Sequence, residues 1–375
     1  MRVLILSCNT GEGHNSGAKA IQEVSDARGD VCEIKDSLTF ISDRFSKFIS
    51  WGHSTMYRHL PGLFKVGYTY SEKHPAVFHE DSGIYKLLTS GTERLYAYLT
   101  EGAYDTVICV HVFSALLLTA ALKAHPMPLK TAFVATDYTC SPIVRESRLD
   151  RYFIPDASIA YEFEFPNIPR ENIVGSGIPI RQAFYRKSDK SEAKARFGIG
   201  ETHSHLLMMC GSMGCGPMGR LADILSDGIG PESEITIVCG TNEKLRQKLE
   251  KKFRERTDVH VLGFVKDMSA LMDSADLYLT KPGGLSVSEA AVKNLPMVYI
   301  DAVAGCEEYN RRHFVRMGGA KTGANVKEVA DTCLQLLRDK ARRGEMEAVL
   351  AAQKLPNASQ TIYDTMAALP ERTEA

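Results

Sequence analysis

The sequence has no excess of charge of either sign. Its 45 Lys and Arg residues stand against 46 Asp and Glu residues, a formal net charge of −1. An overall basic field that binds nucleic acid without sequence preference is therefore excluded, and any anion site has to be local. Long apolar runs are also missing. The longest, residues 110–122, contains polar residues and is shorter than the ~20 residues that cross a bilayer, so we expect any membrane contact to be peripheral.

The sequence also lacks paired cysteines. The nine cysteines are odd in number, scattered, and contain no C-x-x-C pair. This excludes a disulfide scaffold or structural zinc site and favours a reducing, cytoplasmic environment. No pair of carboxylates resembles a D-x-D metal site, so we expect neither a metal nor another cofactor.

The composition is that of an ordinary folded protein. Hydrophobic residues make up 44% of the 375 positions and charged residues 24%, which excludes a disordered or fibrous chain. At ~150 residues per domain, the length predicts two or three domains rather than one.

Apolar strands alternate with helices along the whole chain. In the first half, strands are predicted at 3–7, 31–34, 105–110 and 131–135, and helices at 18–24 and around 84–99. Residues 110–122 are predicted to be a buried strand that runs into a helix. In the second half, strands are predicted at 206–210, 235–239, 259–262, 277–280 and 297–301. This alternation is typical of parallel sheets with helices on both faces.

A charged stretch, residues 186–196, predicts a linker that leads into a short helix. The predicted fold class is therefore α/β, with two Rossmann-like parallel-sheet domains at 1–185 and 186–350. Ligands of open α/β sheets bind at the carboxyl ends of the strands. We therefore expect the two domains to face each other across a cleft that holds the active site.

The first glycine-rich turn links the strand predicted at 3–7 to its helix. It contains Gly11, Gly13 and His14, with Gly17 three residues further on. Glycines let backbone N–H groups approach an anionic or hydroxyl ligand closely, and a histidine can accept a proton near neutral pH. Two other interpretations stay open. One is a dinucleotide site with Asp36 on the ribose, and the other is a helix-capping turn with a structural histidine.

The second glycine-rich turn has the sequence K-P-G-G-L-S-V-S-E and begins at Lys281. Gly283 and Gly284 at a helix start expose N–H groups that suit a diphosphate, and Lys281 adds a charge. Glu289 is placed to accept both hydroxyls of a ribose. The alternative is a capping box, in which Ser286 caps the helix and Glu289 satisfies the same helix terminus.

Two further polar turns follow strands of the second half. The first contains Gly211, Ser212 and Gly214, and its glycines tolerate a bound anion. The second contains Glu307 and Asn310, which are able to bind the hydroxyls of a sugar. Taken alone, the second turn also fits an ordinary polar loop at a helix start.

Together these motifs resemble a known family. A strand followed by G-x-G-H, the turn G-S-x-G-x-G, the G-F-V at 263–265, and K-P-G-G-x-S-x-x-E-A followed by G-x-E-x-x-N occur in order. They are similar to the monogalactosyldiacylglycerol synthase and processive diacylglycerol glucosyltransferase family, which are inverting GT-B glycosyltransferases. The resemblance covers about residues 1–350. It implies a GT-B fold, with 351–375 forming a helix that returns to the first domain.

The resemblance also implies roles for individual residues. On the donor side, the uracil would meet Gly263 and Phe264, the diphosphate Gly284 and Ser286, the ribose Glu289, and the hexose Glu307 and Asn310. On the acceptor side lie Gly13, His14, His111 and Asp137. His14 is the first choice of general base and Asp137 the second. Cys306 stands where members often have Gln, so the sugar, glucose or galactose, stays open.

Basic and aromatic residues gather between 44 and 73. This stretch has five Lys or Arg against one acid, Glu72, and seven of the 31 aromatic residues. Such a composition is typical of a membrane interface, and we expect Phe45, Phe48 and Trp51 to be its anchors. Their helical spacing fits a pair of core-facing helices equally well.

The sequence thus predicts a UDP-hexose:1,2-diacylglycerol 3-beta-hexosyltransferase that makes a membrane glycolipid with inversion. It would act from the cytoplasm as a peripheral protein on the anionic inner face of the cell membrane. Its predicted partners are UDP-hexose and diacylglycerol. A NAD-dependent Rossmann oxidoreductase and a non-catalytic UDP-sugar or lipid-binding protein remain as alternatives.

Overall fold

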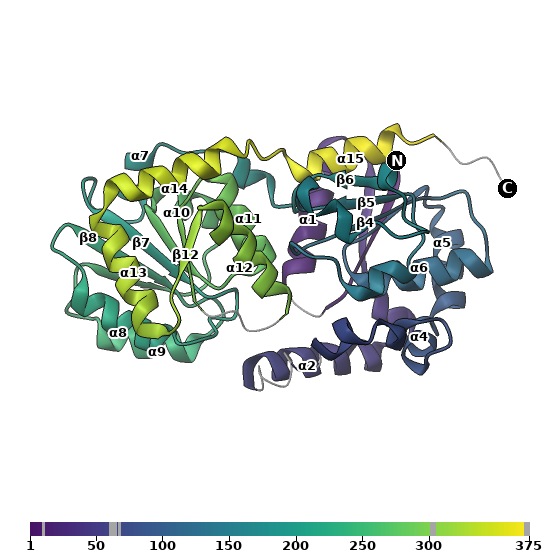
Figure 1. Cartoon of the computed structure of the whole chain (residues 1–375), viewed down its shortest axis with the longest axis horizontal. Coiled ribbons are helices and arrows are strands. Elements are labelled where there is room, and N and C mark those ends of the chain that lie inside the picture. Colours follow the sequence, from purple (N-terminus) through teal and green to yellow (C-terminus); the bar gives the residue numbers. More distant parts are fainter. Residues whose placement is uncertain (10–11, 60–65, 67–68, 301–304, 371–375) are drawn as a thin grey trace. The chain divides into compact units, whose positions relative to one another are not determined.

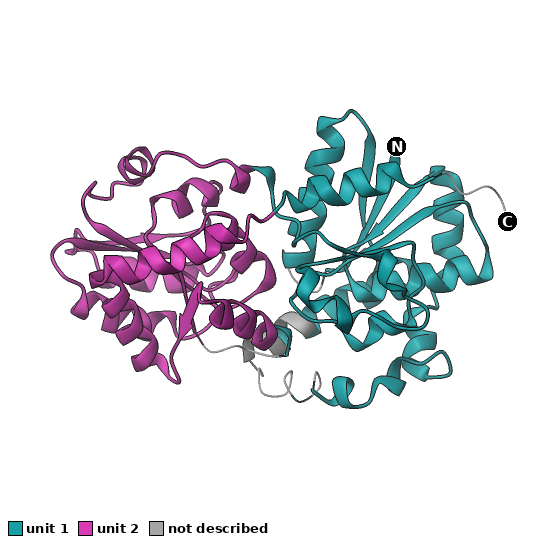
Figure 2. Cartoon of the chain, turned by 45° about the horizontal axis from the view of Figure 1, so that its top comes forward, with its two compact units in different colours: residues 1–182, 303–306, 356–375 teal, residues 183–302, 307–355 magenta. Residues whose placement is uncertain are grey.

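The computed structural model describes residues 1–9, 12–59, 66, 69–300 and 305–370. The chain divides into two compact units (Figure 2). The first contains the described parts of Met1–Gln182, Val303–Cys306 and Pro356–Ala375, and the second those of Ala183–Ala302 and Glu307–Leu355.

The first unit is built on a six-stranded parallel sheet with the order β2-β1-β3-β4-β5-β6 (Figure 1). Its strands are β1 (Arg2–Ser7), β2 (Val31–Asp36), β3 (Thr106–Cys109), β4 (Lys130–Val134), β5 (Arg151–Ile154) and β6 (Ile173–Gly175). Its helices are α1 (Glu12–Ala27), α2 (Asp43–His59), α4 (Gly83–Leu88), α5 (Thr92–Gly102), α6 (Val112–Ala124) and α15 (Ala358–Ala368).

Helices cover this sheet on both faces. Residues of α1 and α15 share a buried cluster with one face, and residues of α5 and α6 share one with the other. Parallel strands buried on both faces have continuous apolar runs, which is why residues 3–6 are fully buried. The four strands predicted in this half are confirmed, as is the helix that follows the third one.

The single helix predicted around 84–99 is wrong, because the structure has two helices there, α4 and α5. The chain leaves the helical path near Gly91, which packs against the backbone of Phe40. A Cβ at this glycine would lie only 2.8 Å from the Phe40 carbonyl carbon. The prediction also missed β5 and β6.

The second unit has its own six-stranded parallel sheet, with the order β12-β11-β10-β7-β8-β9. Its strands are β7 (Ser204–Met209), β8 (Ser233–Val238), β9 (Val259–Leu262), β10 (Leu277–Thr280), β11 (Met297–Tyr299) and β12 (Ala320–Thr322). Its helices are α7 (Lys190–Arg196), α8 (Met218–Gly228), α9 (Glu243–Lys252), α10 (Met268–Ser274), α11 (Gly284–Val292), α12 (Cys306–Met317), α13 (Val326–Arg338) and α14 (Lys340–Ala352).

The five strands predicted in this half are confirmed, and the three-residue strand β12 was missed. The charged stretch after residue 186 does lead into a short helix, α7. Lys293 holds the start of this stretch on the second unit by donating to the Arg186 carbonyl and pairing with Asp273, 2.8 Å away.

The last helix, α15, lies against α1 and β4 of the first unit. Tyr363 is fully buried, and its hydroxyl donates to Asp30 and lies 3.1 Å from the Ser25 hydroxyl. Arg28 forms an ion pair with Asp364 at the same contact. The end of the described chain thus completes the hydrophobic core of the first unit.

Candidate active site

Each sheet has one point at which neighbouring strands continue in opposite directions along the sheet. In the first unit this point lies between β1 and β3, and in the second between β7 and β10. Open α/β sheets bind ligands in the crevice outside the carboxyl ends of the strands at such a point. His14, His111, Gly211 and Lys281 follow these four strands, whereas Asp137, Phe264 and Glu307 follow β4, β9 and β11.

His14 lies in the first turn of α1, directly above β3. Its Nδ1 is 2.8 Å from the Val110 carbonyl oxygen and 3.2 Å from the Thr136 hydroxyl. Because a carbonyl only accepts, Nδ1 carries the ring hydrogen, and in the neutral ring Nε2 keeps the lone pair. The contact with Val110 therefore favours the neutral tautomer with its hydrogen on Nδ1 and its lone pair on Nε2.

His111 and Asp137 belong to the same corner of the first unit. The His111 ring meets the His14 ring edge to face, with centroids 4.6 Å apart. His111 is buried and caps α6, since its Nδ1 accepts from the Phe113 amide at 3.1 Å. Asp137 is half-buried and directly follows Thr136, the residue that contacts His14. Gly13 is half-buried in α1, whereas Gly11 lies outside the described residues.

Asp36 does not support the dinucleotide interpretation. One of its oxygens accepts from the Leu38 amide at 3.0 Å, and the other accepts from Asn9 and from Ser46. The carboxylate thus caps a turn and attaches α2 to the sheet. It forms one wall of a polar hollow of about 330 Å³ above β1 and β2.

In the second unit, the loops after β7 and β8 pack backbone to backbone. Gly211 and Gly214 have φ angles of 71° and 54°, a region that favours glycine. A Cβ on Gly214 would lie 2.3 Å from the Cys239 carbonyl oxygen. The Ser212 carbonyl accepts from the Thr241 amide at 2.8 Å. The glycines are therefore needed for the turn itself to form.

Lys281 and Glu307 form an ion pair of 2.9 Å beside this turn. Their side chains are 18% and 8% exposed, so the pair is largely shielded from water. A Cβ on Gly211 would lie 2.7 Å from the Lys281 Cε, and one on Gly283 would lie 3.8 Å from a Glu307 oxygen. The structure therefore brings together four of the predicted donor-site residues.

Helix α11 begins next to this ion pair. Its N-cap is Gly283, and no side chain caps it. The capping-box alternative is therefore wrong, because Ser286 lies inside the helix rather than at its start. Uncapped N–H groups and the positive end of the helix dipole favour an anion at this position. Ser286 and Glu289, three residues apart, lie on one face of α11, and both are half-buried.

Asn310, the second residue predicted to bind the hexose, is more deeply buried than Glu307. Its side chain is fully buried, and its amide donates to the Pro282 carbonyl at 3.0 Å. A fully buried amide has no surface to offer a hexose. In this structure Asn310 holds the K-P-G-G loop against α12.

Gly263 and Phe264 follow β9. Phe264 is 68% exposed, which is unusual for an aromatic residue and leaves its ring open to stack on a base. Arg246 of α9 lies over Gly263, since a Cβ there would lie 3.1 Å from its Cδ. Arg246 is held by Glu243 and Glu250. The sequence did not single out Arg246, because the charged run around it has the composition of a solvated helix face.

Helix α2 carries the predicted membrane anchors. Phe48 and Trp51 are 62% and 65% exposed, and their rings lie 6.4 Å apart. The core-facing alternative is therefore wrong for these two residues. Phe45 is half-buried, while Arg44 and Lys47 are exposed beside the rings. The rest of the aromatic and basic cluster falls largely outside the described residues.

Among the described residues, no helix has the length and hydrophobicity of a membrane span. The same residues also contain no group of three or more His, Cys, Asp or Glu residues arranged to hold a metal ion.

Two protein families match the chain. Residues 14–180 match monogalactosyldiacylglycerol (MGDG) synthase, and residues 205–362 match the glycosyltransferase family 28 C-terminal domain. Among curated relatives, a processive diacylglycerol beta-glucosyltransferase of Bacillus cereus (strain B4264) is 27% identical over 98% of this chain and 93% of its own length. A probable chloroplastic monogalactosyldiacylglycerol synthase of Glycine max is 28% identical over 91% of this chain and 66% of its own.

Solved structures show the same fold. MurG of Acinetobacter baumannii superposes with a TM-score of 0.66 at 14% identity, covering 98% of this chain and 99% of that one. The Staphylococcus aureus MnaA–UDP structure has a TM-score of 0.60 at 14% identity over the whole of both chains. The fold is thus GT-B. With family matches in both halves, the chain belongs to the monogalactosyldiacylglycerol synthase and processive diacylglycerol glucosyltransferase family of glycosyltransferases.

Proposed function

We propose that this glycosyltransferase moves a hexose from a UDP-sugar to the hydroxyl of diacylglycerol and inverts the anomeric centre. The start of α11 carries the proposal. It is an uncapped helix N-terminus at the strand-order reversal, beside Lys281, and Glu289 lies further along the same helix. The curated relatives, a diacylglycerol glucosyltransferase and a monogalactosyldiacylglycerol synthase, support diacylglycerol as the acceptor.

On the donor side, the N–H groups at Gly284 and the Lys281 ammonium would bind the diphosphate. Glu289 would accept the ribose hydroxyls, and the exposed Phe264 ring would stack on the uracil. Glu307 would bind the hexose, with Asn310 holding the loop behind it. Charge that develops on the leaving diphosphate would be stabilised by Lys281 and the helix dipole. We therefore propose that transfer needs no resident cofactor and survives treatment with EDTA.

On the acceptor side, a single displacement needs one base. The acceptor oxygen attacks the anomeric carbon opposite the diphosphate, the bond to the diphosphate oxygen breaks, and the hydroxyl proton passes to the base. His14 is the first candidate, because its Nδ1 contact with Val110 places the lone pair of the neutral ring on Nε2. Asp137 is the second.

Radiolabelled UDP-glucose and UDP-galactose, each offered with diacylglycerol vesicles, test the reaction and identify the sugar. We expect one labelled glycolipid, with a β linkage by NMR. Saturable UDP binding without product from either sugar would replace the proposal with a non-catalytic UDP-sugar-binding protein. Binding of NAD in preference to UDP would restore the oxidoreductase alternative.

The acyl chains of the acceptor stay in the bilayer, so the enzyme has to reach the headgroups. We propose that α2 docks on the anionic inner face of the cell membrane, from the cytoplasmic side. Phe48 and Trp51 would insert into the headgroup region, and the exposed cations Arg44 and Lys47 contribute ~1 kcal/mol each near an anionic surface. Ser46, buried and bonded to Asp36, anchors the helix to the sheet.

Vesicle co-sedimentation tests this docking. The double variant Phe48→Ser, Trp51→Ser should be released from anionic vesicles, and added salt should weaken the wild type. The matched control is Tyr161→Ser, because Tyr161 is an aromatic residue of the same unit and is 71% exposed. Equal sedimentation of the double variant and the wild type would refute docking through α2.

A further inference from the structure

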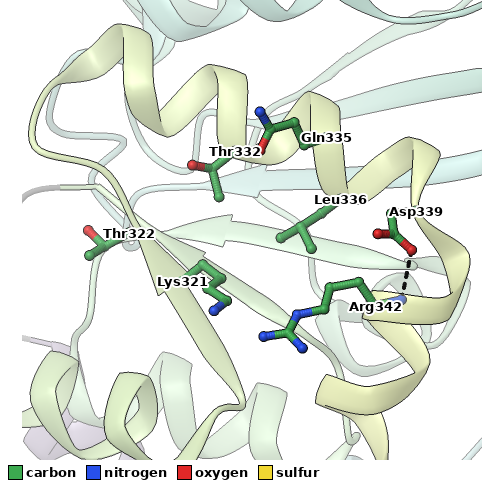
Figure 3. A pocket seen from close by; sticks show the side chains of 7 residues that line it. All are labelled: Lys321, Thr322, Thr332, Gln335, Leu336, Asp339 and Arg342. Atoms are coloured by element: carbon green, nitrogen blue, oxygen red, sulfur yellow. Dashed lines mark hydrogen bonds between the residues drawn. The ribbon is translucent and has the colours of Figure 1, made fainter.

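A second polar hollow lies in the other unit, at the edge strand of its sheet. It has a volume of about 320 Å³, at the lower end of the range for small-molecule sites, and β12, α13 and the start of α14 line it (Figure 3). Its lining residues are Lys321, Thr322, Thr332, Gln335, Leu336, Asp339 and Arg342. None of the residues placed in the donor site is among them.

Lys321 occupies an unusual position in this hollow. It is aligned with Val298 of the neighbouring strand, and Val298 belongs to the core to which α13 contributes. Because aligned residues point to the same face of a sheet, Lys321 stands on the α13 face of β12. Across the part of the chain that the structure describes, its ammonium group makes neither an ion pair nor a hydrogen bond.

Arg342 extends from the start of α14 toward the same space as Lys321 (Figure 3). Its guanidinium pairs with Glu345, but the two side chains are 48% and 62% exposed, and exposed ion pairs contribute little. The lining contains one acid, Asp339, which is engaged in capping α14 by accepting from the Arg342 amide at 2.9 Å. Two cationic side chains therefore face the hollow, and the nearby acids neutralise their charge only in part.

The remaining polar groups define the ligand further. Thr322 and Thr332 donate their hydroxyl hydrogens to the carbonyls of Tyr299 and Glu328, so they offer only oxygen lone pairs to the hollow. The two cationic donors together with hydroxyl acceptors suit an anion that also carries a hydroxyl group.

We propose that this hollow binds a phosphate monoester through Lys321 and Arg342. The phosphate is either that of a soluble ester or that of a lipid headgroup. The site is separate from the donor diphosphate site, and the proposal does not depend on the transferase activity. A lysine that faces inward on an edge strand can instead serve to prevent edge-to-edge aggregation, and the test has to separate the two roles.

The test is calorimetric titration at low ionic strength with glycerol 3-phosphate, in saturating UDP so that the proposed donor site is occupied. We expect saturable binding that weakens at least tenfold in Lys321→Gln and in Arg342→Gln. Lys327→Gln is the matched control, since Lys327 is an exposed residue of α13 outside the lining, and its affinity should stay unchanged.

A vesicle arm identifies the source of the phosphate. Phosphatidic acid in phosphatidylcholine vesicles is compared with phosphatidylcholine alone, using the Phe48→Ser, Trp51→Ser background to remove docking through α2. Binding of the soluble ester assigns a free ligand, whereas vesicle binding alone that is lost in both Gln variants assigns a headgroup. Equal binding by all variants, or saturable binding of neither probe, overturns the proposal. Aggregation of Lys321→Gln with unchanged affinity in Arg342→Gln also overturns it, in favour of edge protection.

Discussion

Glu289 offers the sharpest test of the donor site. If its carboxylate accepts the ribose hydroxyls, Glu289→Gln removes an interaction with a charged group, worth ~1–3 kcal/mol. Since 1.4 kcal/mol is tenfold in affinity, the Kd for UDP should rise roughly 5- to 150-fold. The melting temperature should change little, because Gly283 is the N-cap of α11 and Glu289 lies well inside the helix.

A matched control lies in α13, where Glu328 helps to cap the N-terminus of the helix. The amide of Asn325 donates to Glu328 at 2.7 Å, and its oxygen accepts from the Glu328 N–H at 3.1 Å. Glu328→Gln should therefore lose about 0.3–1 kcal/mol of stability, typical of an acid in the first turn, with UDP affinity unchanged.

The two glutamates should thus give opposite results in two assays, titration calorimetry with UDP and thermal unfolding followed by circular dichroism. If Glu289→Gln binds UDP like the wild type and unfolds earlier, the carboxylate has a structural role. The assignment of the ribose contact would then be refuted.

Three further predictions concern other residues. His14→Ala should lose ~10²–10⁴ in turnover at unchanged UDP affinity, and unchanged turnover would pass the role of base to Asp137. Burial lowers the pKa of His205 from 6.5 to about 4. The stability that the neutral, buried ring contributes is therefore complete above pH 6.5 and is lost as the pH falls from 6.5 to 4. The loss of stability is on the order of 3 kcal/mol. Urea unfolding at pH 7 and at pH 4.5 should show much of this loss in the wild type and a smaller loss in His205→Gln. Gly214→Ala should destabilise by more than ~1–2 kcal/mol through its positive φ and the contact with Cys239, whereas Gly219→Ala, with open space around it, should be neutral or stabilising by denaturant titration.

The sequence by itself determined the features that depend on local pattern. Continuous apolar runs of four or more residues predicted β1, β7 and β11, because strands buried on both faces need them. The glycine turns were also predicted correctly, and the positive φ angles at Gly211 and Gly214 show why glycine is required there. The short strands β6 and β12, with the sequences I-V-G and A-K-T, contain no such run and were missed.

Only the tertiary structure decided which partner each side chain meets. The spacing of Ser286 and Glu289 fits a capping box, yet the helix begins earlier, at Gly283. Helical spacing is the same whether an aromatic face points inward or outward. The exposure of Phe48 and Trp51 follows from how α2 is held at the end of β2, where Ser46 bonds to Asp36. Sequence spacing constrains the local backbone, whereas contacts between residues far apart in the chain, such as that of His14 with Val110, form only when the strands assemble in register.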